Sequence, residues 1–218
     1  MEEDSDETGT LLTAMWHRAR CQFAVFPLIG HVPGYFPREY QREQTSLRFH
    51  YLLERSRALA SDPTIGLVFL HLPVPHPPAI YSRTIGKFTN RGPNNYLDGL
   101  ALADWTLGQI QQSIDGAGLG ARTALIVTAD HGWRMLWRGT PDWTPEEEAA
   151  SRGIDTSGVP FLVKLPGQQS GAVFASPLDN VITGDIALAV LKRQLVRATD
   201  ILRYLDVRPR PEAPRTSY

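Results

Sequence analysis

The sequence predicts an α/β domain in which helices cover both faces of a mostly parallel sheet, an α/β/α layered arrangement. Three short apolar runs, at residues 65–70, 123–128 and 159–165, are typical of buried strands. Amphipathic helical patterns lie between these runs. Strands that alternate with helices usually pair in parallel, because a crossover helix carries the chain back across the sheet before the next strand begins.

Length and composition favour one folded domain. The 218 residues can build a core without disulfide bonds, and 42% hydrophobic with 21% charged residues is typical of a globular protein. Residues 1–10 are acidic and poor in large apolar side chains, and residues 207–218 contain three prolines. We therefore expect a domain at residues 11–206 between an acidic disordered tail and a proline-rich tail.

Charge and cysteine content exclude several classes of function. A net charge of -1 and a pI near 6.6 give no general attraction to nucleic acid, so no nucleic-acid partner is expected. The single cysteine, Cys21, allows neither an intramolecular disulfide nor a thiolate metal cluster. No run of about 20 apolar residues occurs, and the N-terminus is acidic where a signal peptide would be basic.

The first half of the domain is expected to hold one helix, one strand and an irregular loop. Residues 39–59 are rich in helix formers with apolar positions at helical spacing, and Ser61-Asp62-Pro63 ends the pattern. The apolar run at 65–70 follows, and we expect it to be a strand that is buried on both faces. Residues 71–78 contain four prolines, which predict a loop at the end of that strand.

The second half alternates in the same way. Apolar spacing predicts a helix at 97–116, and the strand at 123–128 follows it. Thr144-Pro145-Glu146-Glu147 has the residues of a capping box with proline at the first helical position, so a short helix should begin there. The strand at 159–165 starts beside a proline, and helical spacing over 179–205 predicts one or two further helices.

Asp130 and His131 follow the strand at 123–128 directly, and Gly132 lets the backbone turn. Ligands of open α/β sheets bind beyond the carboxyl ends of strands. A carboxylate beside an imidazole suits Zn²⁺ or Mn²⁺ better than Ca²⁺ or Mg²⁺, which prefer oxygen ligands throughout. The sequence therefore predicts a divalent-metal site at Asp130 and His131. The alternative is that Asp130 caps a turn and His131 is a half-buried structural histidine.

The proline-rich loop offers two more histidines, His71 and His76. These imidazoles could complete a metal shell or, when protonated, bind an oxygen of a phosphate or sulfate; they could also be incidental surface residues. Arg134 is a candidate contact for an anionic substrate. Three further cations follow the loop and are read mainly as solvated surface charges: Arg83, Lys87 and Arg91.

Four segments in order resemble the C-terminal half of a sulfatase-type domain of the alkaline phosphatase/sulfatase superfamily. They are LVFLHLPVPHPP, YLDGLALADWTLG, ALIVTADHG and VPFLVKLPG. The pattern is most similar to the phosphoethanolamine and lipoteichoic acid transferases and covers about residues 65–190. The resemblance implies a truncated alkaline phosphatase-like fold, metal binding by Asp130 and His131, and a substrate or second-metal contact by His76, with His71 a looser match.

The nucleophile that this resemblance implies is not found. The formylglycine motif C-x-P-x-R is absent, since Gln-Phe-Ala-Val follows Cys21, and no strand-to-helix nucleophile turn is recognisable near the N-terminus. We therefore expect either the C-terminal part of a longer enzyme or a degenerate relative. Many transferases of this type carry membrane helices before the catalytic domain. We therefore expect membrane association only through a missing N-terminal portion. For the full-length protein, the resemblance implies a location on the extracytoplasmic face of a membrane or in the periplasm.

Two functions remain open on the sequence. The first is a metal-dependent hydrolase or transferase that acts on anionic sulfate or phosphate esters, with its catalytic nucleophile unknown. The second is a non-catalytic domain of the same fold that binds a metal or an anion without turnover.

Overall fold

The computed structural model describes residues 38–135, 138–155 and 158–207. Its contacts divide the chain into two compact units, Met1–Gln41 and Arg42–Tyr218. Nearly all described residues belong to the second unit, and the first described helix begins slightly before it, at Arg38. The predicted tail at residues 1–10 lies outside the described residues, and so does the predicted tail at 207–218 except for Val207.

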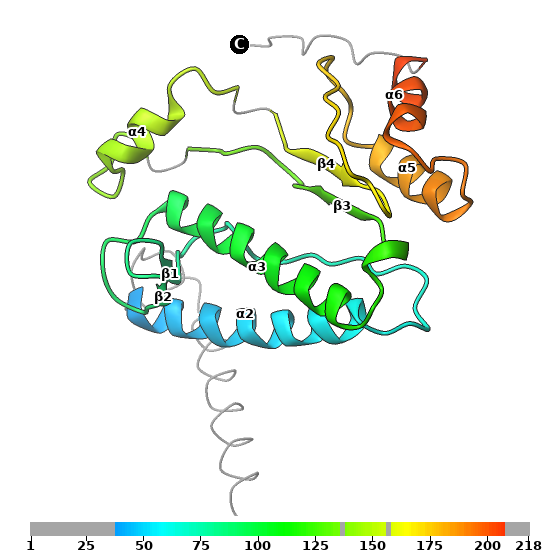
Figure 1. Cartoon of the computed structure of the whole chain (residues 1–218). Helices are drawn as coiled ribbons and strands as arrows, with labels where there is room; N and C mark the ends of the chain where they lie inside the picture. The colour runs from blue at the N-terminus through cyan, green and yellow to red at the C-terminus, as the bar shows by residue number, and fades with distance from the viewer. Residues whose placement is uncertain (1–37, 136–137, 156–157, 208–218) are drawn as a thin grey trace, which may run out of the picture. The chain divides into compact units, whose positions relative to one another are not determined.

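Helices dominate the described part of the chain, with two short pairs of strands (Figure 1). In order, the elements are α2 (Arg38–Ala60), β1 (Tyr81–Ser82), β2 (Lys87–Phe88), α3 (Tyr96–Gly116), the 3₁₀ turn η1 (Gly120–Arg122), β3 (Leu125–Thr128), α4 (Pro145–Ser151), β4 (Phe161–Lys164), α5 (Ile182–Leu191) and α6 (Ala198–Asp206). Among these described helices, none combines the length and the hydropathy that crossing a bilayer requires.

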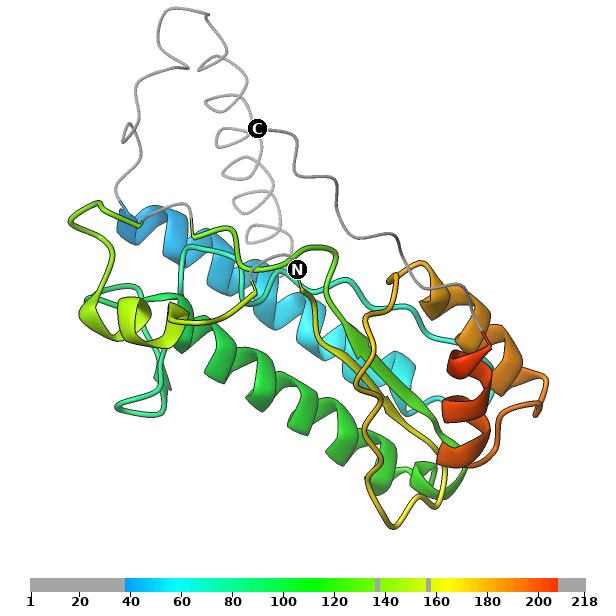
Figure 2. The same cartoon turned by 90° about the horizontal axis from the view of Figure 1, so that it is seen from above.

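The long helices α2 and α3 confirm the sequence prediction to within one residue at each end. They lie side by side and run in the same direction in both views (Figure 1, Figure 2). The Asn95 side chain accepts the Asp98 N–H at the start of α3, and the Asp98 carboxylate accepts the Asn95 N–H. This capping box satisfies N–H groups that have no partner inside the helix, which explains why α3 begins there.

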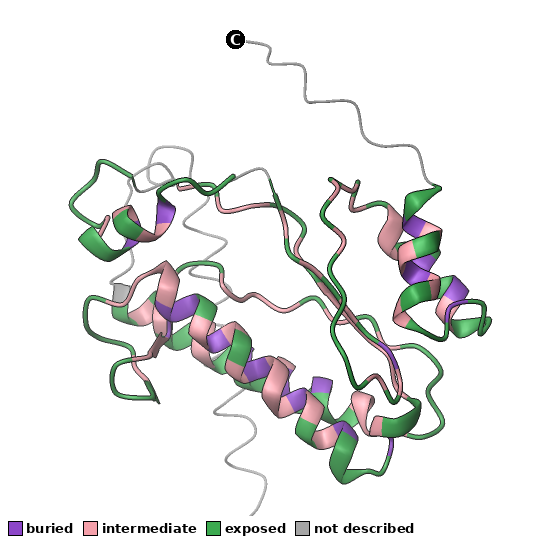
Figure 3. Cartoon of the chain, turned by 45° about the horizontal axis from the view of Figure 1, so that its top comes forward, coloured by how far each residue is buried: buried purple, intermediate pink, exposed green. Residues whose placement is uncertain are grey.

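A first hydrophobic cluster packs α2 against α3 and the segments around them. Phe49 of α2 is fully buried, and Leu102 of α3 is 1% exposed. Buried positions recur along α3 in Figure 3. The buried members are Phe49, Leu53, Ile80, Leu102, Ile110, Ile114 and Leu119.

A second hydrophobic cluster joins α5 and α6 to the end of β4. Ile186 of α5 is fully buried, and Leu165 follows β4 at 1% exposed. Sequence spacing over 179–205 predicted one or two helices, and the chain forms two. The buried members of this cluster are Leu165, Ile186, Ala189, Leu195, Ile201 and Leu205.

Strand β3 connects the two clusters. Leu125 packs against the first cluster, whereas Ala124 and Ile126 pack against the second. Successive side chains of a strand point to opposite faces, so helices cover β3 from both sides. The described part of the chain is therefore mixed α/β, with helices packed on both sides of β3.

The predicted parallel sheet is not found in the described part of the chain. β3 pairs antiparallel with β4, from Leu125 opposite Lys164 to Thr128 opposite Phe161, and the short β1–β2 hairpin, which was not predicted, is also antiparallel. Between β3 and β4 the described residues form one short helix, α4, which lies away from the β3–β4 pair (Figure 1). Without a crossover helix packed on the sheet, the chain can return directly alongside β3 in the opposite direction.

The predicted buried strand at residues 65–70 is wrong. The segment forms no strand pairing, and Leu67 and Phe69 are 61% and 89% exposed. Val68 is half-buried, and Leu70 packs against the first cluster. Only alternate residues are therefore covered, and a continuous apolar run gives no sign of this because its hydrophobicity does not alternate. The irregular loop predicted at residues 71–78 is confirmed.

Helix α4 begins at the predicted capping box and is tied to the start of α3. Thr144 caps the helix, and Glu147 accepts hydrogen bonds from the Thr144 N–H and hydroxyl. Asn95 donates to the Thr144 hydroxyl at 3.1 Å, and the Tyr96 N–H donates to Glu147 at 3.0 Å. The carboxylate of Glu147 is thus almost fully buried yet well supplied with donors, as a buried charge requires.

Candidate metal centre

Asp130 and His131 lie in the loop that leaves the end of β3, as predicted. Their side chains are 70% and 39% exposed, respectively, so both can be reached from solvent. The Asp130 carboxylate oxygen lies 3.9 Å from Nε2 of His131. Two ligand atoms that each lie about 2.1 Å from a tetrahedral ion are about 3.4 Å apart, so the Asp130 and His131 atoms would need to approach by about 0.5 Å to bind one such ion.

The hydrogen bond of His131 determines which ring nitrogen can bind a metal. Nδ1 lies 2.8 Å from the carbonyl oxygen of Gly132. A carbonyl can only accept, so Nδ1 carries the proton, and Nε2 of the neutral ring keeps a free lone pair. Metal-binding histidines usually use their second nitrogen in this way. The ring is therefore set up to offer Nε2 on the side of Asp130.

The pair alone makes a partial site. No group of three or more His, Cys, Asp or Glu side chains in the described residues is arranged to hold a metal ion. Structural and catalytic zinc sites use three or four protein ligands, so two donors do not complete one. The described residues thus fit a divalent ion only with further ligands from water, from an anionic substrate or from residues outside the described ranges.

Asn180 is held against the end of β3, and the sequence prediction missed it. Its side chain accepts a hydrogen bond from the Thr128 hydroxyl and donates one to the carbonyl of Ala129, both at 2.9 Å. Asn180 is half-buried and lies two residues before α5. More than fifty positions separate it from Thr128, so no local pattern could have identified it.

An aromatic stack holds the chain directly after the Asp130–His131 pair. Trp133 stacks on Tyr96 with ring centroids 4.6 Å apart and on Trp143 with centroids 5.2 Å apart. Burial raises the pKa of the Tyr96 hydroxyl. This stack joins the residue after Gly132 to the starts of α3 and α4, and sequence analysis did not predict it.

An ion pair and an indole hydrogen bond support Trp143. Arg138 donates to Glu148 at 2.6 and 3.0 Å, and the Trp143 indole N–H donates to the same carboxylate at 2.9 Å. Hydrogen bonds from Arg138 and then from Trp143 lower the pKa of Glu148. Glu148 therefore stays ionised at neutral pH, and its carboxylate orients the indole ring of Trp143.

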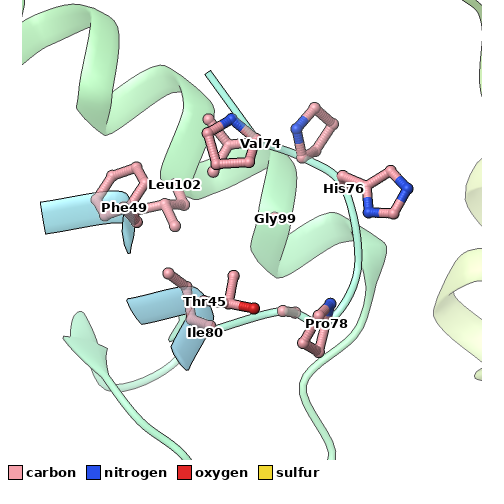
Figure 4. A pocket seen from close by; sticks show the side chains of 11 residues that line it. Thr45, Phe49, Val74, His76, Pro78, Ile80, Gly99 and Leu102 are labelled. Carbon is pink, nitrogen blue, oxygen red and sulfur yellow. The ribbon is translucent and has the colours of Figure 1, made fainter. Parts of the chain in front are cut away.

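His76 lies on the proline-rich loop next to the start of α3. Its Nδ1 is 2.7 Å from the carbonyl of Pro77, which again leaves Nε2 with the free lone pair. Figure 4 shows the imidazole at the rim of a pocket, on the opposite side from Phe49. This pocket has space for only about one water molecule, so it does not accommodate a substrate. Histidine 76 thus remains a surface contact candidate.

The other predicted site residues are spread over the surface. His71 and Arg134 are exposed, and no third ligand from the described residues joins Asp130 and His131. Arg83, predicted to be a solvated surface charge, is half-buried and forms an ion pair with Glu146. The side chains of Lys87 and Arg91 are exposed.

The chain matches a known protein family. The model of the sulfatase family covers residues 22–187, well over half of the 218 residues. No curated protein and no solved structure matches the chain. The matched range contains the β3 end with Asp130 and His131 as well as the His76 loop. The chain therefore belongs to the sulfatase family.

Proposed function

We propose that this chain is a sulfatase-type domain that binds a divalent metal through Asp130 and His131 and acts on sulfate or phosphate esters. The family match supports an ester hydrolase or transferase. The observation that carries the metal-binding role is the free Nε2 of His131, 3.9 Å from the Asp130 carboxylate in an exposed loop at a strand end. Within the family, the sequence pattern favours the phosphoethanolamine and lipoteichoic acid transferases.

The chemistry of the two donors favours Zn²⁺ or Mn²⁺ over Ca²⁺ or Mg²⁺. A bound ion would supply positive charge that polarises the ester oxygen. In this proposal the residues have separate tasks: Asp130 contributes an anionic ligand and His131 a neutral nitrogen ligand. The proposal assigns Arg134, His76 and His71, all exposed, to the oxygens of an anionic substrate. The nucleophile is unassigned.

Metal binding is the first test. The full chain is freed of metal with a chelator, incubated with Zn²⁺ or Mn²⁺, and analysed for bound metal and by calorimetric titration. We expect about one ion per chain, and we expect Asp130→Ala and His131→Ala to lose it. Asp104→Ala, which removes an exposed carboxylate from α3, is the matched control and should bind like the wild type. Absence of metal from the wild type would refute the metal-binding role.

Ester turnover is the second test. Aryl phosphate and aryl sulfate are offered to the metal-loaded chain. If His76 binds substrate, His76→Ala should raise KM more than it lowers kcat while leaving the metal content unchanged. Stoichiometric metal without turnover of either ester would favour the alternative function, a non-catalytic metal- or anion-binding domain of the same fold. That alternative is kept because the described residues provide two ligands rather than a complete set.

A further inference from the structure

We propose that Asn180 is a positioning residue that holds the end of β3 in place, so that Asp130 and His131 face the same ion. The inference rests on the proposed metal-binding function and adds a residue that neither the sequence motif nor the family resemblance assigns. Asn180 touches neither candidate ligand directly. It acts on the backbone and the side chain of the two residues that precede them.

Both the oxygen and the NH₂ group of the Asn180 side chain form hydrogen bonds. Its oxygen accepts hydrogen bonds from the hydroxyls of Thr128 at 2.9 Å and Thr183 at 3.0 Å, and its NH₂ group donates to the carbonyl of Ala129 at 2.9 Å. Donor and acceptor are therefore both matched, which fixes the orientation of the amide. Aspartate or leucine would have a similar size but could not make this set of bonds.

The end of β3 needs such a partner because the ladder with β4 stops there. The last residue pair of the register is Thr128 with Phe161, and the candidate ligands follow two residues later. Beyond this pair, β3 has no further strand pairing among the described residues. Asn180 provides a hydrogen bond to the backbone just past this pair, because its side chain donates to the carbonyl of Ala129, the residue directly before Asp130.

Asn180 itself stands on a rigid support. It lies just before α5, and its own carbonyl accepts the Thr183 N–H at 3.0 Å. Ile182 packs against the second hydrophobic cluster, and Ile186, one turn further along α5, is fully buried in it. A side chain carried by an element anchored in the core can set the position of a loop, whereas one on a mobile segment cannot. The second cluster thus determines where the Asp130–His131 loop starts.

Asn180 would form the same hydrogen bonds if it only stabilised the fold. The test must therefore separate general stabilisation from positioning of the Asp130–His131 loop. The variants are Asn180→Ala, Thr128→Val, which keeps the shape but loses the hydroxyl, and Thr128→Ser, which keeps the hydroxyl. The matched control is Thr123→Val. Thr123 lies just before the other end of β3, and its hydroxyl donates to the carbonyl of Leu119 at 2.9 Å.

The first measurement is hydrogen exchange of the amides at residues 129–132 in the metal-free full chain. Losing the Asn180 or Thr128 bond should speed exchange there by about tenfold, which corresponds to one hydrogen bond. Thr123→Val should leave these amides unchanged, and Thr128→Ser should behave like the wild type. Equal exchange in Asn180→Ala and the wild type would overturn the inference, whatever the metal does.

The second measurement is the affinity for Mn²⁺. Residues that orient metal ligands typically change the affinity by about 10- to 100-fold, and we expect this loss for Asn180→Ala and Thr128→Val but not for Thr123→Val or Thr128→Ser. Equal loss in the Thr123 control would point to general destabilisation and would also overturn the inference. If the wild type binds no Mn²⁺ or Zn²⁺, the proposed function fails, and the exchange result still decides whether Asn180 holds the loop.

Discussion

Gly99 shows how a single residue controls the loop that carries His76. A Cβ at this position of α3 would lie 2.8 Å from the carbonyl oxygen of Pro75, closer than real Cβ contacts allow. Gly99 is buried, and it lines the small pocket together with His76 (Figure 4). The helix and the loop approach each other this closely because no side chain separates them.

We predict that Gly99→Ala destabilises the fold by about 1–3 kcal/mol, because the added methyl must push the His76 loop away from α3. Gly108→Ala is the matched control: it makes the same change in the same helix, and its Cβ would meet nothing within 4 Å. That control should be neutral or should stabilise by about 0.5–1 kcal/mol. Urea unfolding of both variants measures the difference, and equal effects would contradict the close contact.

At the scale of elements, the segment at residues 65–70 differs most from its expected role. A strand buried on both faces would make every large side chain important for stability, but in this segment only Leu70 packs against the first cluster and Val68 is half-buried. Its exposed residues form an apolar row, which includes Leu67 and Phe69. Such a segment contributes to the core through one face only.

We predict that Phe69→Ala changes the free energy of unfolding by less than about 0.5 kcal/mol, as expected for an exposed side chain. Phe49→Ala should cost about 3–5 kcal/mol, because Phe49 is fully buried between α2 and α3. The comparison uses the same substitution at two sites, measured by chemical denaturation. If Phe69→Ala lowered the free energy of unfolding nearly as much as Phe49→Ala, residues 65–70 would be a buried strand, as the sequence predicted.

At the scale of the whole described molecule, stability depends on β3, which contributes side chains to both hydrophobic clusters. The first cluster unites α2 and α3, and the second unites α5 and α6. Because a strand cannot unpack from one cluster without losing its order in the other, we expect the two clusters to unfold together.

We predict that Leu102→Ala in the first cluster and Ile186→Ala in the second each cost about 2–5 kcal/mol and leave a single unfolding transition. Leu102 is 1% exposed and Ile186 is fully buried, so both changes create cavities. Circular dichroism reports helix content, and tryptophan fluorescence reports Trp105, which packs against the first cluster, as well as the stacked Trp133 and Trp143. Two separated transitions in either variant would show that β3 does not couple the clusters.

The elements that sequence alone predicted are those stabilised by neighbours in the chain. The two long helices follow from apolar spacing, and the start of α4 follows from a capping box whose partners are three residues apart. The Asp130-His131-Gly132 motif at a strand end was also readable, because strand and motif are contiguous. In each case the physical cause lies within one or two helical turns.

What the sequence by itself determined is therefore the helices, the central strand and the pair of candidate ligands. Only the tertiary structure decided that β4 runs antiparallel to β3, that residues 65–70 are largely exposed, and that Asn180 binds the residue before Asp130 while Trp133 stacks on Tyr96. These features join residues tens of positions apart. Their meeting depends on how the whole chain packs and closes its long connections, which no local pattern of residue types encodes.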